Sequence, residues 1–209
     1  GIPNVYNDLY AINACFVTTN YDEWLDKLAE PHMADMTPTK KESVSVAESK
    51  AVSAGSPRVF YRKEDLTSEI LWGLGNVIHL HGSLREPAAM ILTTQDYFKH
   101  YRNQYVKEFA KKLFSGEYAI LFMGYSLEED DVLEYILRKK IEGQKYFRLF
   151  PIFSFQEKLF DHLRAYNLNQ WQTELLPYSR DRRNREQLKE IIAIWSAQLR
   201  PIVRPPGFL

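Results

Sequence analysis

Short apolar runs alternate with helical patterns along the chain. The runs are rich in aromatic and β-branched side chains, lack strict apolar–polar alternation and cover residues 14–17, 77–80, 118–123 and 149–153, with a weaker one at 172–176. Such runs are typical of strands that are covered on both faces, as in a parallel sheet. Apolar residues spaced three and four apart at 188–199 predict a helix. The alternation predicts an α/β domain with an open, mostly parallel sheet and helices on both faces.

Two segments do not follow this alternation. Residues 35–58 are rich in Ser, Lys and Ala and contain no aromatic residue. We interpret them as an insertion, either a flexible surface loop or a lid. Residues 200–209 contain three prolines and are expected to form an extended exit toward another domain or partner. The length of the remainder, residues 1–199, predicts a single domain.

Charge and cysteine content narrow the classes of function. The 27 basic and 27 acidic residues cancel, so direct nucleic-acid binding is not indicated by the overall charge. Cys15 is the single cysteine, which excludes an internal disulfide and a multi-cysteine zinc site within this sequence. No apolar run approaches the roughly 20 residues of a membrane span. We therefore expect a cytoplasmic protein that does not enter the membrane.

Polar motifs follow three of the predicted strands: TTNYD at 18–22, HLHGS at 79–83 and FMGYSL at 122–127. Open parallel sheets bind ligands beyond the carboxyl ends of their strands. In the first motif, Asn20 can both donate and accept hydrogen bonds, as a ribose hydroxyl, a carboxamide or a water molecule requires, and Asp22 can accept two. Either residue could instead cap the helix predicted to follow.

The second and third motifs add a candidate base and two glycines. His81 lies where its strand is expected to end and can act as a general base near neutral pH, while His79 is expected to be a packed or hydrogen-bonded neighbour. A metal site would need a third ligand that the spacing does not supply. Gly82 and Gly124 would allow backbone or ligand to approach closely. Ser126 fits a helix-capping box with Glu129.

In this order the motifs resemble the sirtuin-like fold, in particular its bacterial antiphage-defence branch, whose members cleave NAD. The resemblance covers residues 14–178 and implies a Rossmann-like sheet. It implies that His81 is the catalytic histidine and that Asn20 and Asp22 contact the nicotinamide ribose and its carboxamide. It also implies NAD contacts for the following residues: Thr19, Gly82, Gly124 and Ser126.

Two departures from the family pattern shape the expected function. The glycine-rich phosphate loop that follows the first strand of sirtuins does not occur, so we expect an N-terminal strand and this loop to be missing from the sequence. The four-cysteine zinc module of the deacylases does not occur in 84–121 either, where a helix start carries Tyr97 and Phe98. These rings could cover a base or pack in the core. Without the zinc module, hydrolysis of NAD is favoured over deacylation.

Together with the missing zinc module, the resemblance implies an NAD hydrolase that produces nicotinamide and ADP-ribose and needs no metal. It also implies that the protein serves as an abortive-infection effector. Such an activity must be silent in resting cells, which implies a homo-oligomer, a partner defence protein or an additional domain as the switch. One alternative is a zinc-free protein deacylase or ADP-ribosyltransferase. Another is a module that binds NAD or ADP-ribose without turnover.

Overall fold

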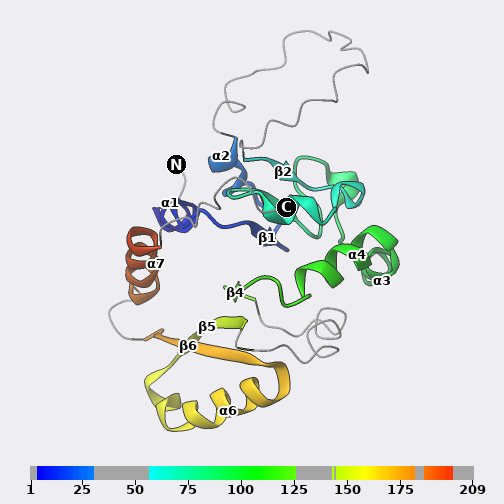
Figure 1. Cartoon of the computed structure of the whole chain (residues 1–209). Helices are drawn as coiled ribbons and strands as arrows, with labels where there is room; N and C mark the ends of the chain where they lie inside the picture. The colour runs from blue at the N-terminus through cyan, green and yellow to red at the C-terminus, as the bar shows by residue number, and fades with distance from the viewer. Residues whose placement is uncertain (1–3, 31–56, 126–142, 144, 182–185, 200–209) are drawn as a thin grey trace, which may run out of the picture. The chain divides into compact units, whose positions relative to one another are not determined.

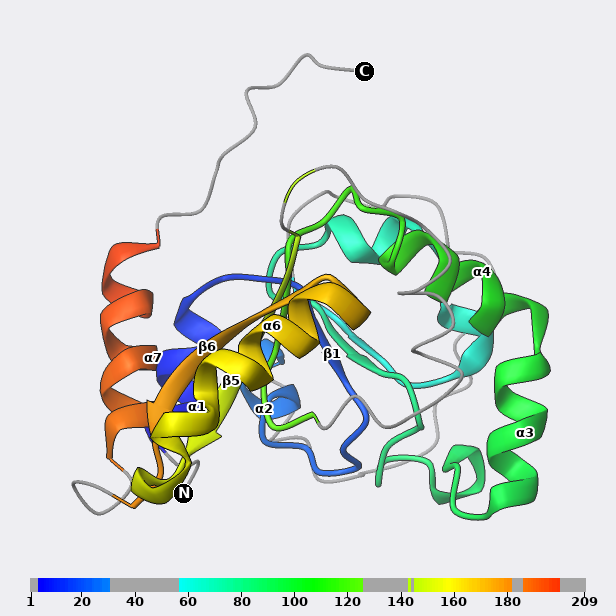
Figure 2. The ribbon, with the colours of Figure 1, turned by 90° about the horizontal axis from the view of Figure 1, so that it is seen from below.

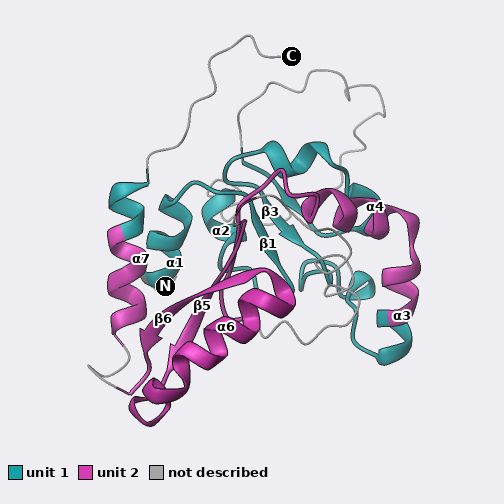
Figure 3. Ribbon diagram, turned by 60° about the horizontal axis from the view of Figure 1, so that its bottom comes forward, with its two compact units in different colours: residues 1–97, 195–209 teal, residues 98–194 magenta. Residues whose placement is uncertain are grey.

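The computed structural model describes residues 4–30, 57–125, 143, 145–181 and 186–199 (Figure 1). The predicted insertion, apart from Pro57 and Arg58, lies outside the described residues, as do Ser126, Glu129 and the exit segment 200–209. The chain divides into two compact units (Figure 3). Unit 1 contains residues 1–97 and 195–209, and unit 2 contains residues 98–194.

Unit 1 is built on a parallel sheet of three strands. β3 (Val77–His79) is central and pairs with β1 (Phe16–Thr18) on one side and β2 (Val59–Phe60) on the other. Every residue of β3 is buried, which explains why the sequence there is uninterruptedly apolar until the histidine.

Short helices precede and follow the three strands in the sequence of unit 1. They are α1 (Asn4–Ala11), α2 (Asp26–Ala29) and the 3-10 turns η1 (Lys63–Asp65), η2 (Glu69–Trp72) and η3 (Pro87–Ala89). α1 is tied to the sheet by Tyr10, whose ring stacks on Phe16 at 5.4 Å between centroids and whose hydroxyl donates to the carbonyl oxygen of Gly75 over 3.0 Å. The start of β1 and the turn before β3 are therefore held by one side chain.

Unit 2 contains the second parallel sheet, in the order β4 (Ile120–Phe122), β5 (Tyr146–Ile152) and β6 (Thr173–Ser179). The turn η4 (Ser154–Leu159) and α6 (Phe160–Trp171) connect β5 to β6, and α6 packs against β6 (Figure 2). α4 (Gln104–Leu113) buries Val106 and Phe109. The boundaries between the units fall within α3 (Thr94–Arg102) and α7 (Gln187–Gln198).

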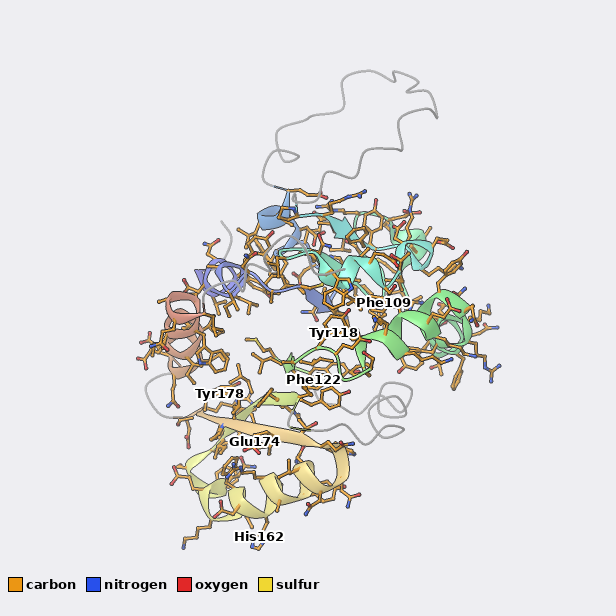
Figure 4. All side chains as sticks on the ribbon, in the orientation of Figure 1. Phe109, Tyr118, Phe122, His162, Glu174 and Tyr178 are labelled. Atoms are coloured by element: carbon orange, nitrogen blue, oxygen red, sulfur yellow. The ribbon has the colours of Figure 1, made fainter. Side chains whose placement is uncertain are left out.

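Aromatic side chains form much of the core of unit 2, and Figure 4 labels Phe109 and Phe122 among them. The buried ring of Tyr146 lies edge-on to Phe114 at 6.0 Å between centroids, and its hydroxyl donates to the carbonyl oxygen of Phe114. Burial raises the pKa of Tyr146 to about 12, so this phenol stays a neutral hydrogen-bond donor.

The predicted strands and the C-terminal helix are confirmed, and parallel sheets with helices between the strands give the chain the expected Rossmann-like α/β character. The strands are joined as two sheets of three, one in each unit. β2 is a strand that the sequence pattern did not predict, because two residues are too few to show a periodicity. Among the described helices, none is long and apolar enough to cross a bilayer.

Candidate functional site

The motifs TTNYD and HLHGS lie side by side where β1 and β3 end. Beyond the paired strands, the backbone N–H of Leu80 donates to the carbonyl oxygen of Thr18 over 2.8 Å. Further along, the N–H of Leu84 donates to the carbonyl oxygen of Tyr21 over 3.1 Å. The predicted proximity of the two motifs at the carboxyl edge of a parallel sheet is confirmed by these bonds.

His81 lies in the turn that follows β3, two residues beyond the last strand residue, His79. Its side chain is nearly buried, with 7% of the residue exposed. The carbonyl oxygen of His81 accepts from the N–H of Ile91 over 2.9 Å, and the imidazole meets Tyr97 edge-on at 5.9 Å between ring centroids. The predicted location at a strand end is confirmed, and the imidazole lies in a mostly enclosed position.

The missing side chain of Gly82 allows the backbone of Ala89 to pack closely against the turn after β3. The φ of Gly82, +85°, is in the left-handed region, and a Cβ added there would lie 2.6 Å from the carbonyl oxygen of Ala89. The hydroxyl of Tyr21 donates to the carbonyl oxygen of Ile91. Residues 87–91 are therefore fixed against the end of β3, and the close approach expected at Gly82 is made by backbone.

The TTNYD segment leaves β1 in a local turn. The N–H of Asn20 donates to the hydroxyl oxygen of Thr18 over 3.0 Å, and Asn20 is exposed while Thr19 is partly exposed. The carboxylate of Asp22 accepts from the N–H of Trp24 over 3.2 Å. α2 begins later, with Leu25 at the N-cap and no capping bond from a side chain. The N–H of Lys27 donates to the carbonyl oxygen of Glu23, so helical bonding begins just after Asp22, and the bond from Trp24 to Asp22 caps the turn that leads into α2. The alternative in which Asp22 caps this helix is thus supported in part, whereas the bond described for Asn20 is made by its backbone N–H.

His79 occupies the centre of a buried polar cluster beneath this segment. Its Nε2 lies 2.7 Å from Oδ1 of Asp26, and its Nδ1 lies 2.9 Å from the carbonyl oxygen of Asn20. Burial lowers the pKa of His79, but the hydrogen bond and the negative charge of Asp26 outweigh burial and raise that pKa above its ordinary value. The expectation that His79 is a hydrogen-bonded neighbour of the site is confirmed.

Arg85 completes the cluster from the turn after β3. Its Nε lies 3.0 Å from Oδ2 of Asp26 in an ion pair that is not aligned as a hydrogen bond. Its Nη1 donates to Oε2 of Glu30 over 2.6 Å. The second carboxylate oxygen of Glu30 accepts from the N–H of Val59, at the start of β2. The cluster thus joins the ends of three segments: the strand β3, the helix α2 and the strand β2.

Five predicted site residues lie on the two segments of unit 1 that these backbone bonds join: Thr19, Asn20, Asp22, His81 and Gly82. Gly124 belongs to unit 2, where its φ of +67° places it in the left-handed region with open space around an added Cβ. Ser126 lies outside the described residues. Among the residues that the structure describes, no group of three or more His, Cys, Asp or Glu side chains could hold a metal ion.

Asp26, Glu30 and Arg85 were not identified from the sequence. Asp26 is fully buried, although an acidic residue at a helix start normally remains in solvent. One signal was available: His79 follows two apolar residues of a fully buried strand, and a buried imidazole needs hydrogen-bond partners. The identity of those partners depends on tertiary contacts more than fifty residues apart in the chain.

A parallel α/β fold with polar side chains at the carboxyl ends of its strands defines a class of ligand-binding domains. A sequence comparison with known families matches the SIR2-like domain over residues 14–176, so the chain belongs to the SIR2-like family. SIR2-like domains use NAD, and the family gives this chain an NAD-dependent activity in general terms. No curated protein matches the chain significantly.

Proposed function

We propose that this SIR2-like domain hydrolyses the bond between nicotinamide and ribose in NAD. The observation that carries the proposal is the arrangement of His81 and Asn20 on two adjoining strand ends, joined by the Leu80 to Thr18 hydrogen bond. A base and an amide located at one sheet edge are what glycosidic cleavage needs: one group to accept a proton and another to orient the ribose or the water.

In the proposed reaction, water forms a bond to C1′ of the nicotinamide ribose while the bond from C1′ to the ring nitrogen breaks. The electron pair of the broken bond passes to nicotinamide, which leaves neutral, and the proton from water is released. His81 acts as the base on a ribose hydroxyl, Asn20 orients the ribose or the water, and Asp22 holds the carboxamide. Thr19 and Gly82 complete the proposed contacts with NAD at this sheet edge of unit 1.

Hydrolysis is favoured over acyl transfer by the composition of the segment that follows His81. Residues 84–121 contain no cysteine, and Cys15 is the single cysteine of the sequence. A four-cysteine zinc module therefore cannot be built from this sequence. This segment forms η3, α3, α4 and the start of β4.

The proposed biological role is depletion of the cytoplasmic NAD pool in response to phage infection. An activity that destroys an essential dinucleotide must be held inactive until it is needed. We propose that oligomerisation, a partner defence protein or an additional domain provides that control.

The experiment compares the protein with NAD alone and with NAD plus an acetyl-lysine peptide. Hydrolysis predicts equal amounts of nicotinamide and ADP-ribose in both reactions. Release of nicotinamide only when peptide is present, with ADP-ribose attached to the acyl group or the peptide, would support the transferase instead. Binding of NAD without any release in either reaction would support a sensing module.

A further inference from the structure

Both ring nitrogens of His79 face hydrogen-bond acceptors. Nδ1 lies 2.9 Å from the carbonyl oxygen of Asn20, and Nε2 lies 2.7 Å from Oδ1 of Asp26. A carbonyl oxygen and a carboxylate can only accept, and a neutral imidazole has a single N–H to donate. Both hydrogen bonds can therefore exist together only if the pair carries one proton more than a neutral imidazole facing a carboxylate.

The surrounding charges locate that proton on the imidazole. Asp26 has no exposed surface, and Nε of Arg85 lies 3.0 Å from its second oxygen. Arg85 lowers the pKa of His79, but the hydrogen bond and the negative charge of Asp26 outweigh this effect and hold the proton on the imidazole. Arg85 also forms an ion pair with Glu30, and the negative charge of Glu23 attracts it electrostatically. The buried imidazolium and the buried carboxylate of Asp26 then form a pair of opposite charges.

We propose that His79, as an imidazolium, is a positioning residue that fixes the backbone carbonyl of Asn20 and with it the TTNYD segment at the end of β1. The effect on NAD cleavage rests on the proposed function, because it acts through Asn20. The hydrogen bond itself does not depend on that function.

Loss of the proton has a defined consequence. The remaining N–H stays with the ionised acceptor, because hydrogen bonds to charged groups are roughly twice as strong as neutral ones. Nε2 then keeps its bond to Asp26, while the lone pair of Nδ1 faces the carbonyl oxygen of Asn20. His79 therefore donates to the carbonyl oxygen of Asn20 when it is charged and loses this one bond when it is neutral, while the other bonds of the segment remain.

Asp26→Asn reverses this consequence while preserving the shape of the side chain. The amide can donate to Nε2 of His79, so a neutral imidazole then carries its proton on Nδ1 and keeps the bond to Asn20. The variant should therefore keep the bond between His79 and the Asn20 carbonyl at alkaline pH, where the parent loses it. His162→Gln is the matched control, because His162 is exposed and points away from the unit 2 sheet on α6 (Figure 4).

The first measurement needs no activity. Imidazole nitrogen NMR of the full chain over a pH titration should show His79 mostly protonated on both nitrogens at pH about 6.5, where an ordinary imidazole is half neutral, and losing its proton only above that pH. The backbone amide nitrogen of Tyr21, which is bonded to the Asn20 carbonyl carbon, should shift in parallel as His79 loses its proton. A His79 that is half neutral or more at pH about 6.5, or a Tyr21 amide that ignores the titration, overturns the proposal.

The second measurement is the pH profile of NAD cleavage, corrected for spontaneous hydrolysis. The parent and His162→Gln should lose about fivefold to tenfold in kcat on the alkaline side, the value of one hydrogen bond. Asp26→Asn should lose this alkaline decrease. An alkaline decrease that is the same in all three proteins overturns the positioning role but leaves the hydrolase. If no protein cleaves NAD, the hydrolase fails and the NMR result decides the proposal.

Discussion

The carbonyl oxygen of Ala89 occupies the space that a Cβ at Gly82 would need, with 2.6 Å between the two atoms. Gly82 directly follows His81, and the N–H of Ile91 donates to the carbonyl oxygen of His81. A glycine with positive φ therefore lets residues 87–91 close over the turn that carries the candidate base.

Gly82→Ala should destabilise the protein by more than the conformational cost of a positive φ alone, which is about 1 kcal/mol. The added methyl group collides with backbone, which cannot rotate away as a side chain can. Gly124→Ala is the matched control, since its φ is also positive but an added Cβ meets open space. Urea unfolding of both variants should show the larger loss at Gly82. Equal losses would contradict the close packing against Ala89.

His81→Ala should abolish NAD cleavage without unfolding the protein. Removal of a positioned base typically costs about a hundredfold to ten-thousandfold in rate. The initial rate of nicotinamide release measures the effect, and circular dichroism checks the fold. His162→Ala on the exposed face of α6 controls for loss of a histidine. Turnover within a few-fold of the parent would remove His81 from the mechanism.

Asn20→Asp should retain the melting temperature and lose activity. The backbone of Asn20 makes the observed bonds, to the hydroxyl of Thr18 and to His79, and neither requires its amide side chain. The substitution removes the side-chain donor while keeping its size. Thermal melting and NAD turnover are measured on the same preparation. A large fall in melting temperature with activity intact would indicate a structural role.

Removal of divalent metal should change neither folding nor NAD cleavage. The sequence holds a single cysteine, and the proposed chemistry uses a base and an amide at the strand ends. Elemental analysis of the purified protein and turnover after exhaustive chelation test this expectation. Stoichiometric zinc whose removal stops turnover would contradict it, together with the reason for preferring a hydrolase over a deacylase.

The stability difference between the parent and Asp26→Asn should depend on pH. Asp26 raises the pKa of His79 in the folded state despite burial. The folded state therefore binds the proton on His79 more tightly than the unfolded state does. The stabilisation is complete below the unfolded value of about 6.5 and is lost as the pH rises through the higher folded value. Urea unfolding between pH about 6 and 9 should show the difference shrinking. A difference that grows with pH would contradict the ion pair.

The strand ends could be predicted from the sequence because they depend on local signals. The apolar run at 77–80 and the polar residues after it predicted both β3 and the position of His81. β1 was expected at 14–17 and is observed at Phe16–Thr18, a displacement of one or two residues that is usual for element boundaries.

The buried cluster could not be predicted because its members are separated in the chain and ordinary in composition. Arg85 lies in a turn and Asp26 at the start of a four-residue helix, where charged residues are normally solvated. Their pairing requires β3 to lie beside β1, which brings His79 under Asn20. A single sequence contains no direct record of this contact.

The most direct test of the proposed hydrolase is to incubate the full-length protein with NAD in the absence of any peptide and follow the reaction by proton NMR. The account predicts that NAD disappears while nicotinamide and ADP-ribose accumulate in equal amounts, and that His81→Ala leaves NAD intact. NAD that stays intact with the folded parent protein, whether bound or free, would contradict the proposed activity.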